Sequence, residues 1–307
     1  MKLFVTGSGG MLGRNVIENP YIKTHTLITP RSSELDLTDY NRVYQFLGDT
    51  KPDFIIHCAG KVGGIQANMN YLYEYFTENA VMGINLVRAA KSIGIKRFIN
   101  LSSSCAYPRN YIQPLKEEYI LRGELEPTNE GYALAKLSVL KMCEYISREY
   151  PDFQYKTLIP CNLYGKYDKF GESNSHMIPA AIRKIHDAKM AGAPSVTIWG
   201  DGNARREFLY AGDLADCIAC AVQNFNQVPN LMNVGVGRDY TINKYYQIIQ
   251  DVIGYHGDFT HDVSKPVGMQ QKLLDISRQT KFGWQPKTKL VDGIRETYKF
   301  YKMEHTK

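Results

Sequence analysis

The chain has 307 residues, a formal charge of +6, 44% hydrophobic residues and 22% charged residues. Such a chain can bury a substantial core, as one large α/β domain or as a large domain with a smaller companion, and its composition excludes disordered and collagen-like proteins. Lys and Arg are scattered and form no long run, so the charge does not indicate a nucleic-acid partner.

Residues 1–7 predict a strand that leads into a glycine turn, without the long apolar stretch of a signal peptide or membrane span. We therefore expect no membrane association and a cytoplasmic location, where the six cysteines stay free. Cys217 and Cys220 form a CxxC pair inside an apolar helical run, and no second pair completes a zinc site. We expect core packing for this pair and no metal.

Apolar, β-rich runs alternate with amphipathic helical patterns along the first half of the chain. Strands are expected at 3–6, 26–29, 54–58, 97–101 and 155–159, and helices at 11–18, 71–93 and 129–149. Thr128 and Asn129 are expected to cap the last of these helices with their side chains. The alternation predicts an α/β fold with a doubly wound parallel (Rossmann) sheet, on which ligands bind at the carboxyl ends of the strands.

The pattern loosens after Gly165. A loop is expected at 171–175, helices at 178–190, 243–253 and 290–303, and a strand at 196–199. We expect residues 1–165, with about 196–230, to form the Rossmann domain. Residues of about 166–195 and 231–307 would then form a smaller C-terminal α/β substrate-binding domain.

A GxxGxxG motif occupies residues 7–13, at the end of the first expected strand. Glycines permit positive φ there and let backbone amides approach a pyrophosphate at the positive end of the next helix. The motif predicts a dinucleotide site, although a plain tight turn is the alternative. The expected cofactor-binding residues here are Gly7, Gly10, Met11, Leu12 and Gly13.

The end of the second expected strand indicates which dinucleotide is bound. An NAD site usually has an acidic residue there for the ribose 2′-hydroxyl, whereas this chain has Thr29-Pro30-Arg31. The guanidinium of Arg31, with Arg14 as a second contact, can hold a 2′-phosphate. Charge-assisted bonds of about 1.5–3 kcal/mol would favour NADP(H) by roughly tenfold or more. The alternative is that Arg31 is a solvent-facing loop residue.

Tyr132 and Lys136 form a YxxxK motif on an expected helix, and this spacing puts both side chains on one face. A free tyrosine has a pKa of about 10, so proton transfer near neutrality needs a cation that stabilises the phenolate. Lys136 can supply that cation, and Ser103, at the end of the fourth strand, would bond the same substrate oxygen. A glycine turn, this serine and YxxxK in this order resemble short-chain dehydrogenases/reductases, which implies hydride transfer.

Further segments resemble the GDP-L-fucose synthases, a group of the extended short-chain dehydrogenase/reductase or NAD-dependent epimerase/dehydratase family. They lie at residues 57–65, 103–108, 125–132, 162–165, 173–179, 206–209, 264–266 and 272–275. The resemblance implies NADPH-dependent conversion of GDP-4-keto-6-deoxy-D-mannose to GDP-L-fucose, by inversion at C3 and C5 and reduction at C4. It also implies a homodimer packed through residues 71–93 and the helix of Tyr132.

In that family a cysteine and a histidine exchange the acidic protons beside the C4 ketone, and the matching residues here are Cys105 as base and His176 as acid. The structural alternative for Cys105 is a small buried residue after the strand, and for His176 it is a helix-start residue bonded to the backbone. Catalytic residues are thus expected to be Ser103, Cys105, Tyr132, Lys136 and His176. The resemblance adds cofactor contacts from Ala59, Lys136 and Asn162, and substrate contacts from Asn162, His176, Lys184, Trp199, Arg206 and Lys272.

The chain departs from the family pattern at Cys161, at Lys166, and at 269–272, where Met-Gln-Gln-Lys replaces the usual Thr-Pro-Arg-Lys. A C4 ketoreductase of a related GDP-4-keto-6-deoxyhexose or GDP-4-keto-heptose, without epimerisation, therefore stays open as an alternative. A 4,6-dehydratase would need an acidic residue near Ser103, and a 4-epimerase would hold NAD tightly, which Arg31 opposes. A non-catalytic NADPH-sensing protein is opposed by the intact catalytic trio.

Overall fold

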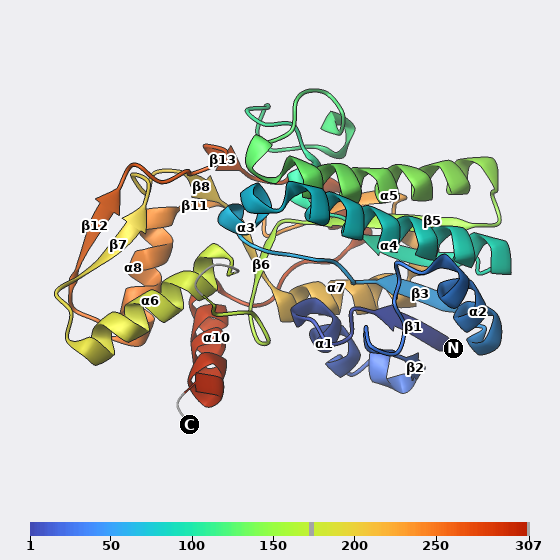
Figure 1. The fold of residues 1–307 in the computed structure, drawn as a ribbon, viewed down its shortest axis with the longest axis horizontal. Coiled ribbons are helices and arrows are strands. Elements are labelled where there is room, and N and C mark those ends of the chain that lie inside the picture. The colour runs from blue at the N-terminus through green and yellow to red at the C-terminus, as the bar shows by residue number, and fades with distance from the viewer. Residues whose placement is uncertain (172–174, 306–307) are drawn as a thin grey trace.

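The computed structural model describes residues 1–171 and 175–305. A six-stranded parallel sheet lies at its centre, in the order β10-β5-β4-β3-β1-β2 (Figure 1). The strands are β1 (Lys2–Thr6), β2 (Thr26–Ile28), β3 (Phe54–His57), β4 (Arg97–Leu101), β5 (Gln154–Pro160) and β10 (Leu231–Val234). The prediction of a doubly wound parallel sheet is confirmed.

Helices cover both faces of this sheet because alternate residues of each strand point to opposite sides. Leu3 and Val5 of β1 belong to the core under α1 (Met11–Glu18) and α7 (Ala211–Gln223). Phe4, between them, belongs to the opposite core. The helices on that second face are α2 (Tyr40–Thr50), α4 (Leu72–Ile93) and α5 (Glu130–Glu149).

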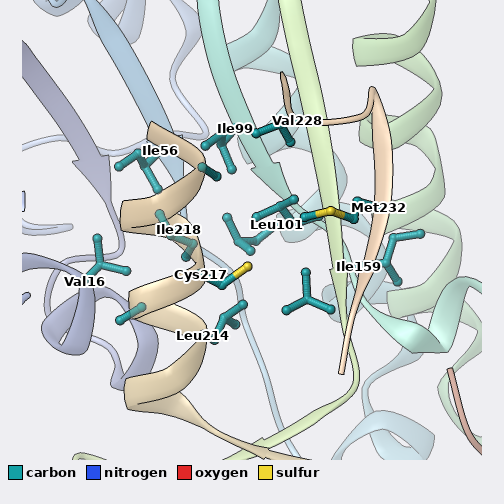
Figure 2. Close-up of a cluster of buried hydrophobic side chains, with 14 of the residues drawn as sticks. Val16, Ile56, Ile99, Leu101, Ile159, Leu214, Cys217, Ile218, Val228 and Met232 are labelled. Atoms are coloured by element: carbon teal, nitrogen blue, oxygen red, sulfur yellow. The ribbon is translucent and has the colours of Figure 1, made fainter. Parts of the chain in front are cut away.

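Cys217 projects from α7 into the first of these cores, beside Leu101 and Ile218 (Figure 2). Cys217 is fully buried. Cys220 is only partly buried, and its sulfur accepts a hydrogen bond from Nδ2 of the Asn224 side chain. Core packing is therefore confirmed for Cys217, and all six thiols are free.

A second, smaller region contains α6 (Met177–Ala191), α8 (Ile242–Ile253) and α10 (Leu290–His305), which pack around Ile182, Ile249 and Ile294. Its strands are β7 (Ser195–Trp199), which pairs with β12 (Asp258–Asp262), and β8 (Arg205–Arg206) between β11 (Tyr240–Thr241) and β13 (Gln271–Lys272). The remaining strands and α-helices are β6 (Asn162–Tyr164), β9 (Phe208–Tyr210), α3 (Ile65–Asn70) and α9 (Ser277–Phe282). Across the described ranges, no helix combines the length and apolarity needed to cross a membrane.

Two strands belong to other sheets than the expected domain boundaries imply. β7, expected with the Rossmann sheet as part of 196–230, pairs with β12 of the smaller region. β10, expected in the smaller domain as part of 231–307, completes the central sheet beside β5. Hydrophobic pattern predicts that a strand forms but not which sheet accepts it, because pairing is decided by contacts distant in the sequence.

Candidate active site

The carboxyl ends of β1, β3 and β4 form the floor of the candidate site, and Thr6 joins the first two. Its Oγ1 lies 2.8 Å from His57 Nδ1 and accepts a hydrogen bond of 3.1 Å from the Ala59 amide. Burial, helped by the charge of Lys136, lowers the pKa of His57 to about 3. A neutral His57 therefore supports the floor of the site and carries no charge at neutral pH.

The glycine turn after β1 lies very close to the backbone of neighbouring segments, which leaves no room for side chains at Gly7 and Gly13. Gly7 has φ +66°, and an added Cβ would lie 2.7 Å from the Ala59 backbone. A Cβ on Gly13 would lie 2.1 Å from the Gly7 carbonyl oxygen, so this glycine lets α1 start against the turn. Gly10 is the N-cap of α1 and has no side chain to cap the first amides, which include those of Met11 and Leu12. These amides fit a dinucleotide pyrophosphate.

The two arginines expected at the 2′-phosphate lie on either side of this turn. Arg31 is exposed just after β2, and its backbone N–H donates to the Glu34 carboxylate at 2.6 Å. Arg14 places its guanidinium carbon 4.1 Å from the centroid of the Tyr167 ring. Both residues are exposed, and their contact with NADP(H) stays a prediction.

Ser103, Tyr132 and Lys136 come together as expected. The Tyr132 hydroxyl hydrogen-bonds the Ser103 side chain, and Lys136 Nζ donates to the Leu101 carbonyl at 3.0 Å, at the end of β4. Burial, and then the nearby Cys105, raises the pKa of Tyr132, while the bond to Ser103 opposes this rise. Burial lowers the pKa of Lys136 to about 8. The expected lowering of the Tyr132 pKa by Lys136 is therefore absent from the protein alone, because desolvation dominates at both groups.

Cys105 lies in a short 3₁₀ turn, Ser104–Ala106, directly after β4. The Ser103 hydroxyl oxygen accepts from the Cys105 amide at 3.2 Å, which fixes the turn. The residue is partly buried, and its sulfur accepts from two donors, Asn129 Nδ2 at 3.5 Å and Lys272 Nζ at 3.6 Å. Asn129 is the N-cap of α5 but makes no capping bond with its side chain.

The capping role expected for Thr128 and Asn129 is therefore wrong. Thr128 donates from its amide and hydroxyl to the Glu126 carboxylate, and the Asn129 amide contacts the Cys105 sulfur. The Asn129 side chain could in principle cap the helix or contact the distant sulfur. The sequence does not show which of the two it does, and only the tertiary structure decides.

His176 is the N-cap residue of α6. Burial first, and then the charges of Lys169 and Lys272, lower its pKa, so the imidazole is mostly neutral at neutral pH. Gly64 brings the loop after β3 against this segment, since an added Cβ would lie 2.8 Å from the Ser175 carbonyl oxygen. Ser173 and Asn174, which belong to the same expected motif and loop, lie outside the described residues.

The residues that the family resemblance implies as substrate contacts lie on other segments of the chain. Asn162 Nδ2 donates to the Glu207 carbonyl at 2.8 Å, and Arg206 Nη2 donates to the Val267 carbonyl at 2.7 Å. Burial lowers the pKa of Arg206. Trp199 is 40% exposed, with Lys184 Nζ 5.2 Å from its ring centroid. An exposed aromatic face beside a cation can stack on a nucleotide base, so both residues remain proposed contacts.

A model of the NAD dependent epimerase/dehydratase family matches residues 3–235. The chain belongs to this family. It is 53% identical over 301 residues to GDP-L-colitose synthase from Yersinia pseudotuberculosis, which covers 98% of both chains. It is 48% identical to GDP-L-fucose synthase from Azorhizobium caulinodans, covering 98% of this chain and 96% of the relative. A GDP-mannoheptose C4 reductase from Campylobacter jejuni with NADP bound superposes with a TM-score of 0.89 at 28% identity, covering 98% of each chain.

The departures from the family pattern have structural roles. Gln271, where the family usually has Arg, donates from Nε2 to Asp239 Oδ2 at 2.6 Å, and Arg205 binds the same carboxylate. Cys161 is buried, and burial raises the pKa of its thiol well above the usual value. Lys166 pairs at the surface with Glu18 at 3.4 Å.

Sequence reasoning missed two residues that support the site. Asn129 was expected to act at the helix start, and Glu207 was treated only as part of a motif. Glu207 is fully buried and accepts from the amides of Val236 and Gly237, and from that of Leu274 at 3.0 Å. Burial raises its pKa to about 7. No local sequence signal distinguishes such a buried carboxylate from a surface one, because its three partners lie far along the chain.

Proposed function

We propose that this chain is an NADPH-dependent oxidoreductase that converts GDP-4-keto-6-deoxy-D-mannose to GDP-L-fucose. The observation that carries the proposal is the placement of the Cys105 sulfur beside the hydrogen-bonded Ser103 and Tyr132 hydroxyls at one strand end. Epimerisation requires a base for proton abstraction, which the sulfur can be, and reduction at the adjacent carbon requires a donor to the ketone oxygen, which the phenol can be. The names of the relatives at 53% and 48% identity support a GDP-linked deoxysugar.

Epimerisation uses the acidity of the C3 and C5 hydrogens beside the C4 ketone. Cys105 removes the proton from one face, and His176 returns a proton to the other. Because burial and two lysines lower the pKa of His176, its protonated form is a strong acid that is present in a small fraction at neutral pH. After each inversion Cys105 releases its proton to solvent and His176 takes one up from solvent, so that the pair is reset before the second carbon is inverted.

Reduction follows at C4. Bound NADPH supplies the hydride; Tyr132 gives its proton to the ketone oxygen, and Ser103 donates a hydrogen bond to that oxygen. Lys136, which donates to the Leu101 carbonyl, would bind the cofactor ribose. The backbone amides after Gly10 would hold the pyrophosphate, and Arg31 and Arg14 would hold the 2′-phosphate.

The test is turnover of GDP-4-keto-6-deoxy-D-mannose with NADPH in deuterated water. Loss of NADPH absorbance, deuterium at C3 and C5, and a product with the L-galacto configuration are expected. Cys105→Ser should abolish deuterium incorporation and inversion while retaining some direct ketone reduction. Fully inverted product from Cys105→Ser at the parental rate would contradict the role given to this thiol.

Two related activities compete. The 53% identity to GDP-L-colitose synthase favours the formation of GDP-L-colitose. The fold similarity to the GDP-mannoheptose C4 reductase favours reduction without epimerisation. A panel of GDP-4-keto-6-deoxyhexoses and GDP-4-keto-heptoses, scored by NADPH consumption and product stereochemistry, separates the three.

The cellular setting is part of the same proposal. We place the enzyme in the cytoplasm, where it supplies a precursor of a surface polysaccharide, and as a homodimer packed through α4 and α5. Exposed apolar side chains on these helices, including Tyr73, Phe76 and Leu134, support this packing. Sedimentation of the wild-type chain against a Phe76→Glu, Leu134→Glu double variant tests it, with a monomeric variant expected.

A further inference from the structure

The side chain of Glu207 joins three segments that lie far apart in the sequence. Its Oε1 accepts hydrogen bonds from the Val236 amide at 2.6 Å and from the Gly237 amide at 2.7 Å, in the turn after β10. Its Oε2 accepts from the Leu274 amide at 3.0 Å, two residues after β13. Glu207 itself lies between β8 and β9. One carboxyl group therefore links the end of a central strand to two strands of the smaller region.

The backbone around this carboxyl leaves just enough room for it. A Cβ on Gly235 would lie 2.4 Å from Glu207 Oε1, so a side chain at this position would collide with the carboxyl. Gly237 has φ +70°, a conformation that glycine adopts without strain. The buried Gln279 accepts from the Gly235 amide at 2.8 Å and donates to the Gly235 carbonyl at 3.1 Å. The turn after β10 is therefore fixed, and Glu207 ties Leu274 to it.

The Leu274 amide belongs to the segment that carries Lys272. The parallel register of β13 with β8 sets Lys272 beside Arg206. Arg206 also directly precedes Glu207 in the chain. The bond between Glu207 and the Leu274 amide thus lies one residue beyond the first cation and two residues beyond the second. This bond connects the backbone of the two cations at the point where their strands end.

Arg206 and Lys272 form no salt bridge within the part of the chain that the structure describes. Arg206 Nη2 donates to the Val267 carbonyl at 2.7 Å, and Glu126 acts on its charge only at longer range. Lys272 is 7% exposed, and its Nζ lies 3.6 Å from the Cys105 sulfur. Two poorly solvated cations on adjacent strands repel each other, and an anion bound by both would offset this repulsion. A diphosphate is such an anion.

We infer that Glu207 is a positioning residue for the substrate diphosphate, because its bond to the Leu274 amide holds Lys272 beside Arg206. The inference rests on the proposed GDP-linked substrate and on the substrate contacts expected of these two cations. The Glu207 carboxyl is fully buried and acts through them without touching the substrate. Since the segment is already ordered, less conformational entropy is lost when the diphosphate binds.

Glu207→Gln tests the inference with a side chain of nearly the same shape. The glutamine oxygen can still accept from Val236 and Gly237, but its NH₂ group then faces the Leu274 N–H, and two donors cannot form a hydrogen bond. The reverse orientation would lose the other two bonds, so the first orientation is expected. Hydrogen exchange of the peptide that covers residues 271–275, measured without any ligand, should therefore be faster than in wild type.

Titrations with GDP and with NADPH separate positioning from general damage. At pH 8, above the Glu207 pKa of about 7, Glu207→Gln should weaken GDP binding and leave NADPH binding unchanged. The loss should be roughly tenfold, as expected when the lysine no longer donates a charge-assisted bond to the diphosphate. Glu117→Gln is the matched control, because it removes another buried carboxyl that accepts a backbone amide, that of Asn233. It should bind GDP like wild type.

A double variant shows whether the carboxyl acts through the lysine. GDP affinity of Glu207→Gln combined with Lys272→Gln should equal that of Lys272→Gln alone, since effects at residues that work through one another are not additive. Additive losses would mean that Glu207 affects GDP binding by another route and would overturn the inference.

With a wild type that binds GDP, unchanged exchange of residues 271–275 or unchanged GDP affinity in Glu207→Gln would also overturn the inference. So would equal losses of GDP and NADPH affinity, which would show a general effect on the fold. If Glu207→Gln does not fold, wild-type exchange decides: slow exchange of residues 271–275 without ligand supports the inference, and exchange at the rate of a free loop refutes it. A wild type that binds no GDP would instead refute the proposed function and the diphosphate role together, whereas faster exchange in Glu207→Gln would still show that the carboxyl fixes the segment.

Discussion

Lys136 lies one helical turn beyond Tyr132 on α5, with its Nζ 5.8 Å from the centroid of the tyrosine ring and bonded to the Leu101 carbonyl. The phenol is paired with Ser103 instead. In the protein alone, burial governs the pKa of both groups. The ammonium is thus held at the strand end, where the cofactor ribose is proposed to lie.

Tyr132→Phe should lower kcat for C4 reduction by about 10²–10⁴, because it removes the proton donor and leaves the ring in place. Deuterium exchange at C3 and C5 should continue, since it uses Cys105. NADPH oxidation and exchange are measured on one sample. Tyr44→Phe, at an exposed tyrosine on α2, is the control; parental reduction by Tyr132→Phe would refute the role of the phenol.

Gly7→Ala should weaken NADPH binding and lower the melting temperature. Alanine at φ +66° costs about 1–2 kcal/mol, and its Cβ would also collide with the Ala59 backbone at 2.7 Å. Gly9→Ala is the matched control, because an added Cβ there meets nothing within 4 Å. Fluorescence titration with NADPH and thermal unfolding compare the two variants. Equal effects at both positions would mean that the turn geometry does not govern binding.

Arg31→Ala should weaken NADPH binding by roughly tenfold or more and leave the affinity for NADH unchanged, because only NADPH carries the 2′-phosphate. Isothermal titration with both cofactors measures the ratio. Arg295→Ala, at an exposed arginine on α10, controls for the loss of surface charge. A parallel loss of both affinities would instead indicate damage to the turn.

Glu207 should make stability depend on pH. Burial raises its folded-state pKa from 4.5 to about 7, so the fold favours the protonated carboxyl. This contribution is fully present below about pH 4.5 and is lost as the pH rises through 7. The unfolding free energy of wild type should therefore fall by on the order of 2 kcal/mol between pH 4.5 and pH 8, relative to that of Glu207→Gln over the same range. Chemical denaturation across this range measures it, with Glu296→Gln as an exposed control; a difference that stays flat would show that Glu207 titrates normally.

The sequence determined most of the architecture. Expected strands and helices match the structure within a few residues, because β-rich apolar runs and helical periodicity are local properties. Glycine positions and the YxxxK spacing likewise determine where the proposed cofactor turn and the proton-transfer pair lie. Through its resemblance to the family, the motif at 103–108 predicts a catalytic role for Cys105.

Only the tertiary structure decided what surrounds Cys105. Asn129 has the sequence of a helix cap but contacts a sulfur, and Lys272 reaches the same atom from a strand near the other end of the chain. The burial of Glu207 and the placement of β7 and β10 in different sheets were also decided there. Local periodicity encodes which element forms, whereas charge, desolvation and strand pairing depend on neighbours that are brought together only by the folded core.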